Sequence, residues 1–153
     1  MMSQRVNPDL FPALLQVLRR GCPALLLTVD PDGFPHTAFT WTVALDAAHL
    51  RFAADHGSVT LTNLERESRA ALQIISQNNL IFLVKGAARL AKPQIEAAPF
   101  RVAMMDLAIS EVKDQSWPGV RVQPLGYEWP PEQRESMRAM EQAVYTEMRT
   151  WPG

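Results

Sequence analysis

Hydrophobic and polar positions along this chain follow a period of two in some segments, as in β-strands, and a helical period in others. Residues 24–29 are almost continuously apolar, which predicts a strand buried on both faces. Residues 35–44 alternate instead, with Phe39, Trp41 and Val43 on one face and small or polar residues on the other. This second face suits either solvent or a flat ligand lying on the sheet.

Further strands are predicted from short apolar runs bounded by turn residues, at 50–54, 70–75, 80–91 and 101–112. The segment Asp30-Pro-Asp-Gly33 is a tight turn between the strands at 24–29 and 35–44. A second short turn at 46–48 leads into the strand at 50–54. These three strands therefore form a meander.

Two segments in the first half of the chain have helical periodicity. The first is Pro8–Arg20, with Asn7 as its predicted N-cap and Gly21 as its stop signal. Its apolar face consists of Leu10, Leu14, Val17 and Leu18. The second is the segment 58–67, for which Ser58 is the predicted N-cap.

A third helix is predicted from Pro131 to residue 151, because proline is favoured at the first helical position. It carries an apolar stripe of Met137, Met140, Val144, Met148 and Trp151. This stripe packs either on the domain's own strands or on a partner chain, since methionine-rich faces adapt to other proteins. The preceding segment, rich in Pro, Gly and Trp, is predicted to be an irregular loop.

Composition narrows the class of protein. The 153 residues are 47% hydrophobic with a net charge of −1, which indicates a globular domain and argues against a nucleic-acid partner. No apolar run is long enough for a membrane span. The single Cys22 cannot form an internal disulfide, so we expect a structural thiol in a cytoplasmic protein.

Candidate chemistry is concentrated where the second helix begins. The histidines at 36, 49 and 56 lack the spacing of a zinc site, so no metal is expected. At Gly57-Ser58-Val-Thr60, in contrast, the first helical turn leaves backbone N–H groups free, and the helix dipole favours an anion. Plain N-capping by Ser58 is the alternative. His56, next to this start, is either a loop residue or a ligand contact.

Two motifs resemble those of the flavin-binding split-barrel family, the pyridoxamine 5'-phosphate oxidase relatives. The first is Leu26-Leu-Thr-Val-Asp-Pro-Asp-Gly-Phe-Pro-His36, and the second is Leu50-Arg-Phe-Ala-Ala-Asp-His-Gly-Ser-Val-Thr-Leu-Thr-Asn-Leu64. The resemblance implies a mostly β fold with flanking helices, a six-stranded antiparallel split β-barrel. The chain then reads as one domain, 1–153, with an N-terminal helix at 1–22, the barrel at 24–112, a loop at 113–130 and a C-terminal helix at 131–151.

The resemblance further implies an FMN-binding oxidoreductase that acts as a homodimer on a small-molecule substrate. The residues that it assigns to the cofactor are Phe39, Thr40, Trp41, Thr42, Ala53, Ala54, Ser58, Val59 and Thr60. The cations that hold the flavin phosphate in such oxidases are replaced here by Ala38, Val43, Val59 and Thr60. Cations of neighbouring elements that could take their place are Arg66, Arg69, Lys85 and Arg89.

The loss of these cations leaves other functions open. One is a reductase that uses the deazaflavin F420, and another is a non-enzymatic split barrel that binds haem or a small apolar ligand. The family's shared cofactor sites also make Trp117 either a loop residue that covers the partner's cofactor or a surface aromatic packed on Pro118. No catalytic residue is assigned.

Overall fold

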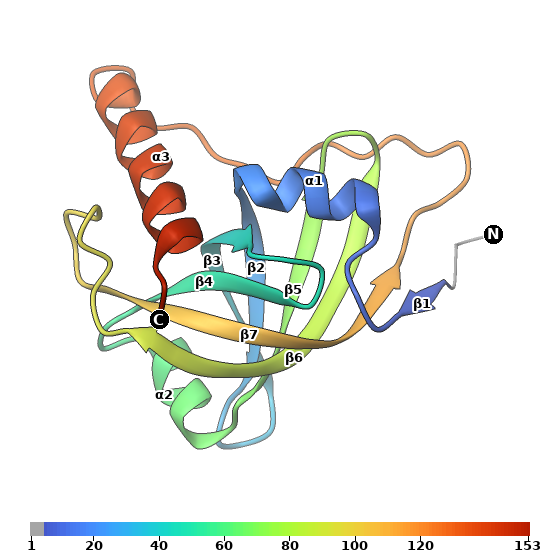
Figure 1. The fold of residues 1–153 in the computed structure, drawn as a ribbon, viewed down its shortest axis with the longest axis horizontal. Helices are drawn as coiled ribbons and strands as arrows, with labels where there is room; N and C mark the ends of the chain where they lie inside the picture. The colour runs from blue at the N-terminus through green and yellow to red at the C-terminus, as the bar shows by residue number, and fades with distance from the viewer. Residues whose placement is uncertain (1–4) are drawn as a thin grey trace.

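The computed structural model describes residues 5–153, whose strands and helices are shown in Figure 1. The strands are β1 (Val6–Asn7), β2 (Cys22–Val29), β3 (Pro35–Ala44), β4 (His49–Asp55), β5 (Arg69–Ser76), β6 (Leu80–Lys92) and β7 (Val102–Asp114). The helices are α1 (Pro12–Arg20), α2 (Val59–Arg66) and α3 (Arg134–Thr150). Of the helices in this described part, none is both long and apolar enough to cross a membrane.

Six of the strands close into an antiparallel barrel. Their order is β7-β4-β3-β2-β5-β6, and β6 pairs with β7 to complete the circle. The short strand β1 adds to the outside edge of β7, where Val6 lies opposite Lys113. The predicted mostly β fold, a six-stranded antiparallel split barrel with flanking helices, is therefore confirmed.

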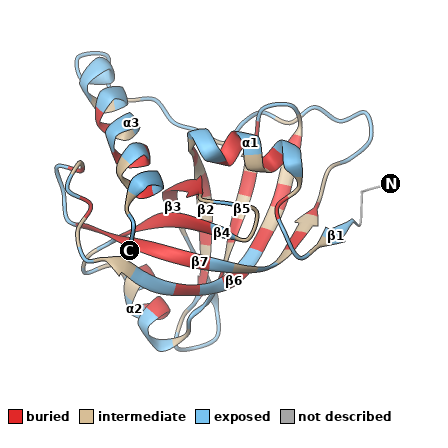
Figure 2. Ribbon diagram, viewed as in Figure 1, coloured by how far each residue is buried: buried red, intermediate tan, exposed pale blue. Residues whose placement is uncertain are grey.

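The barrel interior forms the larger hydrophobic core, and α1 covers one of its ends (Figure 1). Leu14 and Leu18 of α1 are fully buried in the same cluster as Leu72 and Phe52 of the strands. Figure 2 shows the buried residues concentrated on the strands and on one side of each helix. Cys22 belongs to this core, and burial raises the pKa of its thiol to about 12, as expected for a structural residue.

A second core lies between α3 and the outer face of the barrel. Met140, Val144 and Met148 of α3 pack there with Trp41 and Val43 of β3. Of the two alternatives for the methionine stripe, packing on the chain's own strands is therefore the correct one. Trp41 and Val43 do not form a free apolar surface, because α3 covers them.

Two helices begin later than the sequence predicted. Asn7 does not cap a helix at Pro8, because it pairs with Val112 of β7 and its side chain donates to the Asp9 carbonyl. Residues 8 and 9 form a bend, Phe11 is the extended N-cap residue, and α1 starts with Pro12 at its first position. Residues 131–133 likewise form a turn, so that α3 starts at Arg134.

Candidate functional site

The strands β3 and β4 separate after only three paired positions, the last of which joins Thr42 to Phe52. Beyond this pair, the Thr40 side chain replaces the backbone of β3 as the partner of β4. The Ala53 N–H donates to Thr40 Oγ1 at 3.1 Å, and the Thr40 hydroxyl donates to the Ala53 carbonyl at 2.6 Å. The part of β3 before Trp41 pairs with β2 only. Its other edge therefore borders an opening in the barrel wall.

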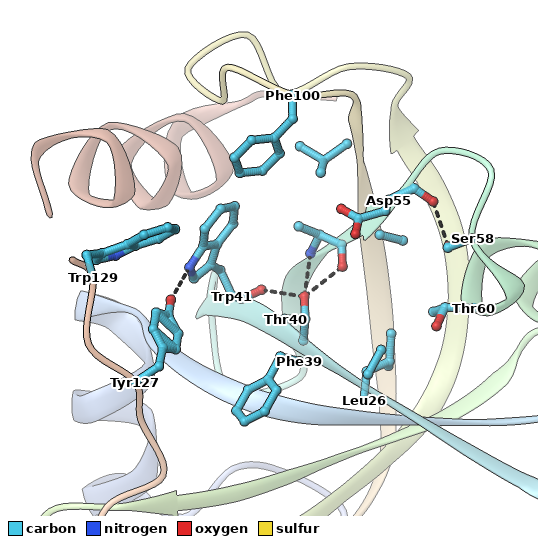
Figure 3. Close-up of a pocket in the computed structure, with 14 residues that line it drawn as sticks. Leu26, Phe39, Thr40, Trp41, Asp55, Ser58, Thr60, Phe100, Tyr127 and Trp129 are labelled. Atoms are coloured by element: carbon cyan, nitrogen blue, oxygen red, sulfur yellow. Dashed lines mark hydrogen bonds between the residues drawn. The ribbon is translucent and has the colours of Figure 1, made fainter. Parts of the chain in front are cut away.

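A cavity of about 430 Å³ lies at this opening, which is within the size range of small-molecule sites. It is bounded by β3 and β4, by the start of α2 and by two connecting segments, as Figure 3 shows. The small side chains of Ala38, Ala53 and Ala54 leave this space open.

Seven of the nine residues predicted to bind a cofactor line this one cavity. They are Phe39, Thr40, Trp41, Ala53, Ala54, Ser58 and Thr60. Thr42 is not among the lining residues, because its side chain is fully buried and its hydroxyl donates to the Arg51 carbonyl at 3.1 Å. Val59 is not among them either, since its side chain on α2 is 52% exposed to solvent.

One side of the cavity is an aromatic wall, formed by Phe39, Trp41, Phe100, Tyr127 and Trp129. Trp41 and Phe100 stack with ring centroids 5.9 Å apart, while Phe39 and Trp129 each meet Tyr127 edge to face. Such pairs contribute about 0.5–1.5 kcal/mol each beyond the area that they bury. The wall offers flat apolar surfaces to a ligand with rings.

The carboxylate of Glu141 on α3 holds the aromatic wall from behind. It accepts hydrogen bonds from the indole N–H groups of Trp41 and Trp129, at 3.0 and 2.9 Å, and from the Tyr127 hydroxyl. Burial, followed by the hydrogen bond to Glu141, raises the pKa of Tyr127. The Tyr127 hydroxyl is therefore a structural donor in this network.

The start of α2 contributes the polar end of the cavity. Ser58 is the N-cap, as predicted: its Oγ accepts from the Leu61 N–H at 3.1 Å and donates to the Asp55 carbonyl at 2.6 Å. Its single proton is thus already used, so the Ser58 hydroxyl is engaged within the turn while Ser58 still lines the cavity. The Thr60 hydroxyl makes no hydrogen bond to any described residue, so it remains free for a ligand.

The charge of the cavity is negative. Among the described residues that line it, none is a Lys, Arg or His, and Asp55 supplies a carboxylate. The four cations considered as substitutes point elsewhere: Arg66 to Asn63 and the Val29 carbonyl, Arg69 to Glu67, Lys85 to Glu111 and Arg89 to Asp106. An anionic ligand therefore finds only neutral donors here.

The remaining candidates lie outside the cavity. His56 bonds through Nε2 to the Pro93 carbonyl at 2.6 Å, which ties the loop before α2 to the segment after β6. Trp117 borders a separate hollow beside Arg5 and Phe11. In the part of the chain that the structure describes, no group of His, Cys, Asp or Glu is arranged to hold a metal.

The sequence did not reveal five important residues of the site, namely Asp55, Phe100, Tyr127, Trp129 and Glu141. Tyr127 and Trp129 fall in the segment predicted only as an irregular loop. Their spacing of two residues, with one acidic residue between them, was the available signal. It identifies no partner, because Trp41 is 86 residues away from Tyr127 along the chain.

Comparison with known proteins agrees with this architecture. Residues 10–123 match the family model described as pyridoxamine 5'-phosphate oxidase, which is three quarters of the chain, so the protein belongs to this family. No curated protein matches the chain at a significant level.

Three solved structures illustrate the similarity. A protein of Lactobacillus delbrueckii assigned as a pyridoxamine 5'-phosphate oxidase has 22% identity and a TM-score of 0.57, over 69% of this chain and 94% of its own. An F420 reductase has 19% identity and a TM-score of 0.55, and the match covers 63% of this chain and 93% of the reductase. HupZ of Group A Streptococcus has 14% identity and a TM-score of 0.55, and the match covers 71% of this chain and 98% of HupZ. At these identities the likeness shows the fold alone.

Proposed function

We propose that the protein binds a flavin-type cofactor in the cavity between β3 and β4 and serves as an oxidoreductase. The observation that carries this proposal is the unpaired edge of β3 beside the aromatic wall. A strand edge presents backbone N–H and C=O groups in a row, and a flavin ring has polar atoms along its rim. Membership of the pyridoxamine 5'-phosphate oxidase family supports the same class of ligand.

The residues present fit the ring part of such a cofactor. The cavity is large enough, Ala53 and Ala54 leave its base free, and the exposed Phe39 ring offers an apolar face beside the edge of Trp41. For a phosphate-bearing chain the fit is limited to neutral groups, namely the Thr60 hydroxyl and the first N–H groups of α2. FMN, the cofactor expected from the sequence, is the first ligand to test.

The protein's own part in the reaction is to bind and orient. A bound flavin supplies the hydride or electron chemistry, and the surrounding residues position it and keep water away. The aromatic wall covers one side of the cavity, and Glu141 fixes its position through three hydrogen bonds. We assign no catalytic acid or base.

A second candidate is the deazaflavin F420. The specific observation in its favour is the lack of a cation among the described residues that line the cavity, since a tightly held phosphate monoester calls for Arg or Lys. Haem has less support, because Tyr127, the lining residue that could ligate its iron, is engaged by Trp41 and Glu141.

The test is direct binding. The purified protein is examined for visible absorbance, and a small molecule released by denaturant is identified by mass spectrometry. Apoprotein is then titrated with FMN, riboflavin and F420, with the quenching of their fluorescence as the signal. Binding of at least one of them is expected, and failure of all three would refute the proposal.

The variant Ala53→Leu places a larger side chain in the cavity and should abolish binding. Its matched control is Ala108→Leu, which adds the same group at an exposed position of β7 and should leave binding unchanged. Equal affinity in both variants would place the ligand outside this cavity.

A further inference from the structure

The one formal charge that lines the cavity is the carboxylate of Asp55, as far as the described residues go. Asp55 is the last residue of β4, and its backbone carbonyl accepts from both the Ser58 hydroxyl and the Ser58 N–H, at 2.6 and 3.3 Å. The side chain is thus carried by the same tight turn that begins α2. Figure 3 shows its carboxylate turned toward the cavity while its carbonyl faces Ser58.

This carboxylate is not neutralised by a neighbour. Asp55 forms no ion pair or side-chain hydrogen bond with any of the residues that the structure describes. The nearest cation along the adjoining segment is Arg101, which lies between the lining residues Phe100 and Val102 but does not itself line the cavity. Asp55 is itself exposed at the edge of the cavity, and a ligand group placed at the start of α2 therefore meets a negative charge that no described residue pairs with.

We infer that Asp55 determines which flavin-type ligand the cavity accepts: a ring whose attached chain is uncharged or carries a single negative charge, as in a phosphodiester. A terminal phosphate monoester carries about 1.5–2 negative charges at neutral pH, so its repulsion by the carboxylate is roughly double that of a diester. The helix start and the Thr60 hydroxyl offer the same neutral donors to either group. This inference rests on the proposed function, and it names the specificity-determining residue of the same site.

The experiment compares riboflavin and FMN, which differ only in the terminal phosphate, on matched variants. Asp55→Asn removes the charge and keeps the shape of the side chain. Glu65→Gln is the control, because it removes one negative charge from the exposed side of α2 without touching the cavity. Neither side chain bonds to another described residue, so both variants should fold like the wild type.

In the wild type, the two ligands should bind with affinities within about tenfold of each other, since neutral hydrogen bonds are all that favours the phosphate. In Asp55→Asn, the affinity for FMN should rise by about tenfold and that for riboflavin by less than about twofold. Glu65→Gln should leave the ratio unchanged within about twofold, because Glu65 does not line the cavity.

The dependence of FMN affinity on salt is a second measurement, and it would not change if Asp55 had only a structural role. Added salt should increase the affinity of the wild type for FMN, because it screens a repulsion, and should have a smaller effect on Asp55→Asn. The phosphodiester ligand F420 should gain less than FMN from Asp55→Asn.

Three outcomes would overturn the inference. The first is the same FMN-to-riboflavin ratio in Asp55→Asn and the wild type. The second is a wild-type preference for FMN of several hundredfold that is lost in Arg101→Ala, because a cation would then reach the phosphate. The third, binding of neither ring to any variant, would refute the proposed function as well, whereas the first two leave flavin binding intact.

Discussion

The indole N–H of Trp129 donates to the Glu141 carboxylate across 2.9 Å, and this bond joins an irregular segment to the C-terminal helix. The same carboxylate accepts from Trp41 on the barrel. One acidic side chain therefore connects three parts of the chain behind the cavity. The position of the aromatic wall depends on it, although Glu141 itself does not line the cavity.

We predict that Glu141→Ala destabilises the protein by about 2–3 kcal/mol, because hydrogen bonds to a charged group contribute about 1.5–3 kcal/mol. The Trp129 indole and the Tyr127 hydroxyl lose their acceptor, while the Trp41 indole keeps its bond to the Tyr127 hydroxyl. Urea unfolding measures the change, and near-ultraviolet circular dichroism should show the tryptophans losing their fixed environment. Gln142→Ala, at the next and exposed position, is the control and should stay within about 0.5 kcal/mol of the wild type. Equal stability of the two variants would contradict the role given to Glu141.

Thr60→Val tests whether a cofactor chain reaches the start of α2. The Thr60 hydroxyl has no described protein partner, so the apoprotein should keep its unfolding free energy within about 0.5 kcal/mol. The affinity for FMN should fall by about 2–10-fold, the effect of one neutral hydrogen bond, and that for riboflavin should fall less. Thr62→Val is the matched control, since the Thr62 hydroxyl donates to the Ser58 carbonyl instead. Unchanged FMN affinity in Thr60→Val would place the phosphate elsewhere.

Glu147 should make stability depend on pH. Burial acts to raise the pKa of Glu147, but hydrogen bonds from Lys92 and from the N–H groups of Glu96 and Ala97 hold it below its ordinary value of 4.5. A lowered pKa in the folded state stabilises the protein above pH 4.5, and this stabilisation disappears as pH falls through the folded-state pKa.

Glu147→Gln should accordingly be about 2 kcal/mol less stable than the wild type at pH 7, with a difference that shrinks below pH 4.5. Urea unfolding at a series of pH values measures this. Glu132→Gln, an exposed residue, should show no such pH dependence. A constant difference from pH 7 to pH 3 would rule out the ionised carboxylate as the cause.

We expect the protein to be a homodimer through the mouth of the cavity. The apolar surface that supports this is formed by Phe39, Phe100 and Tyr127, which are 59%, 41% and 43% exposed around one opening. Phe39→Ser should weaken association, as measured by sedimentation of the apoprotein over a range of concentrations. Phe34→Ser, 68% exposed at the turn before β3, is the control. A monomer at micromolar concentration would contradict the expectation.

Local sequence was sufficient for most strands and helices because the barrel strands carry their own periodicity, whereas the closed barrel was predicted from the family resemblance. The alternation of β3, the tight turn before it and the Ser58 cap are all local signals, and each was predicted correctly. The start of α1 was not, because it depends on the pairing of Asn7 with Val112. Nothing in the residues around Pro8 records a partner so far along the chain.

The contrast between local signals and distant pairing also explains which residues of the site were predicted correctly. The Gly57-Ser58 turn and the β3 residues are near one another in sequence, so their motifs were informative. Thr42 was assigned to a ligand because it shares a face with Thr40, but it lies at the last paired position of β3 and β4 and is buried there. Where two strands stop pairing is decided by the whole barrel, and the alternation of a single strand does not reveal it.

Hydrogen exchange along the free edge of β3 should report whether a ligand is bound there. Backbone amides of residues 38–41 that face the opening have no strand partner, so their hydrogens should exchange with heavy water rapidly in the apoprotein, whereas those bonded to β2 should be protected. A molecule that binds along this edge would slow the exchange of the first set alone. Mass spectrometry of the peptide that contains residues 38–41 would measure this exchange. A mixture of compounds that slows it contains a ligand for the edge, and the measurement needs no labelled compound and no assay of activity.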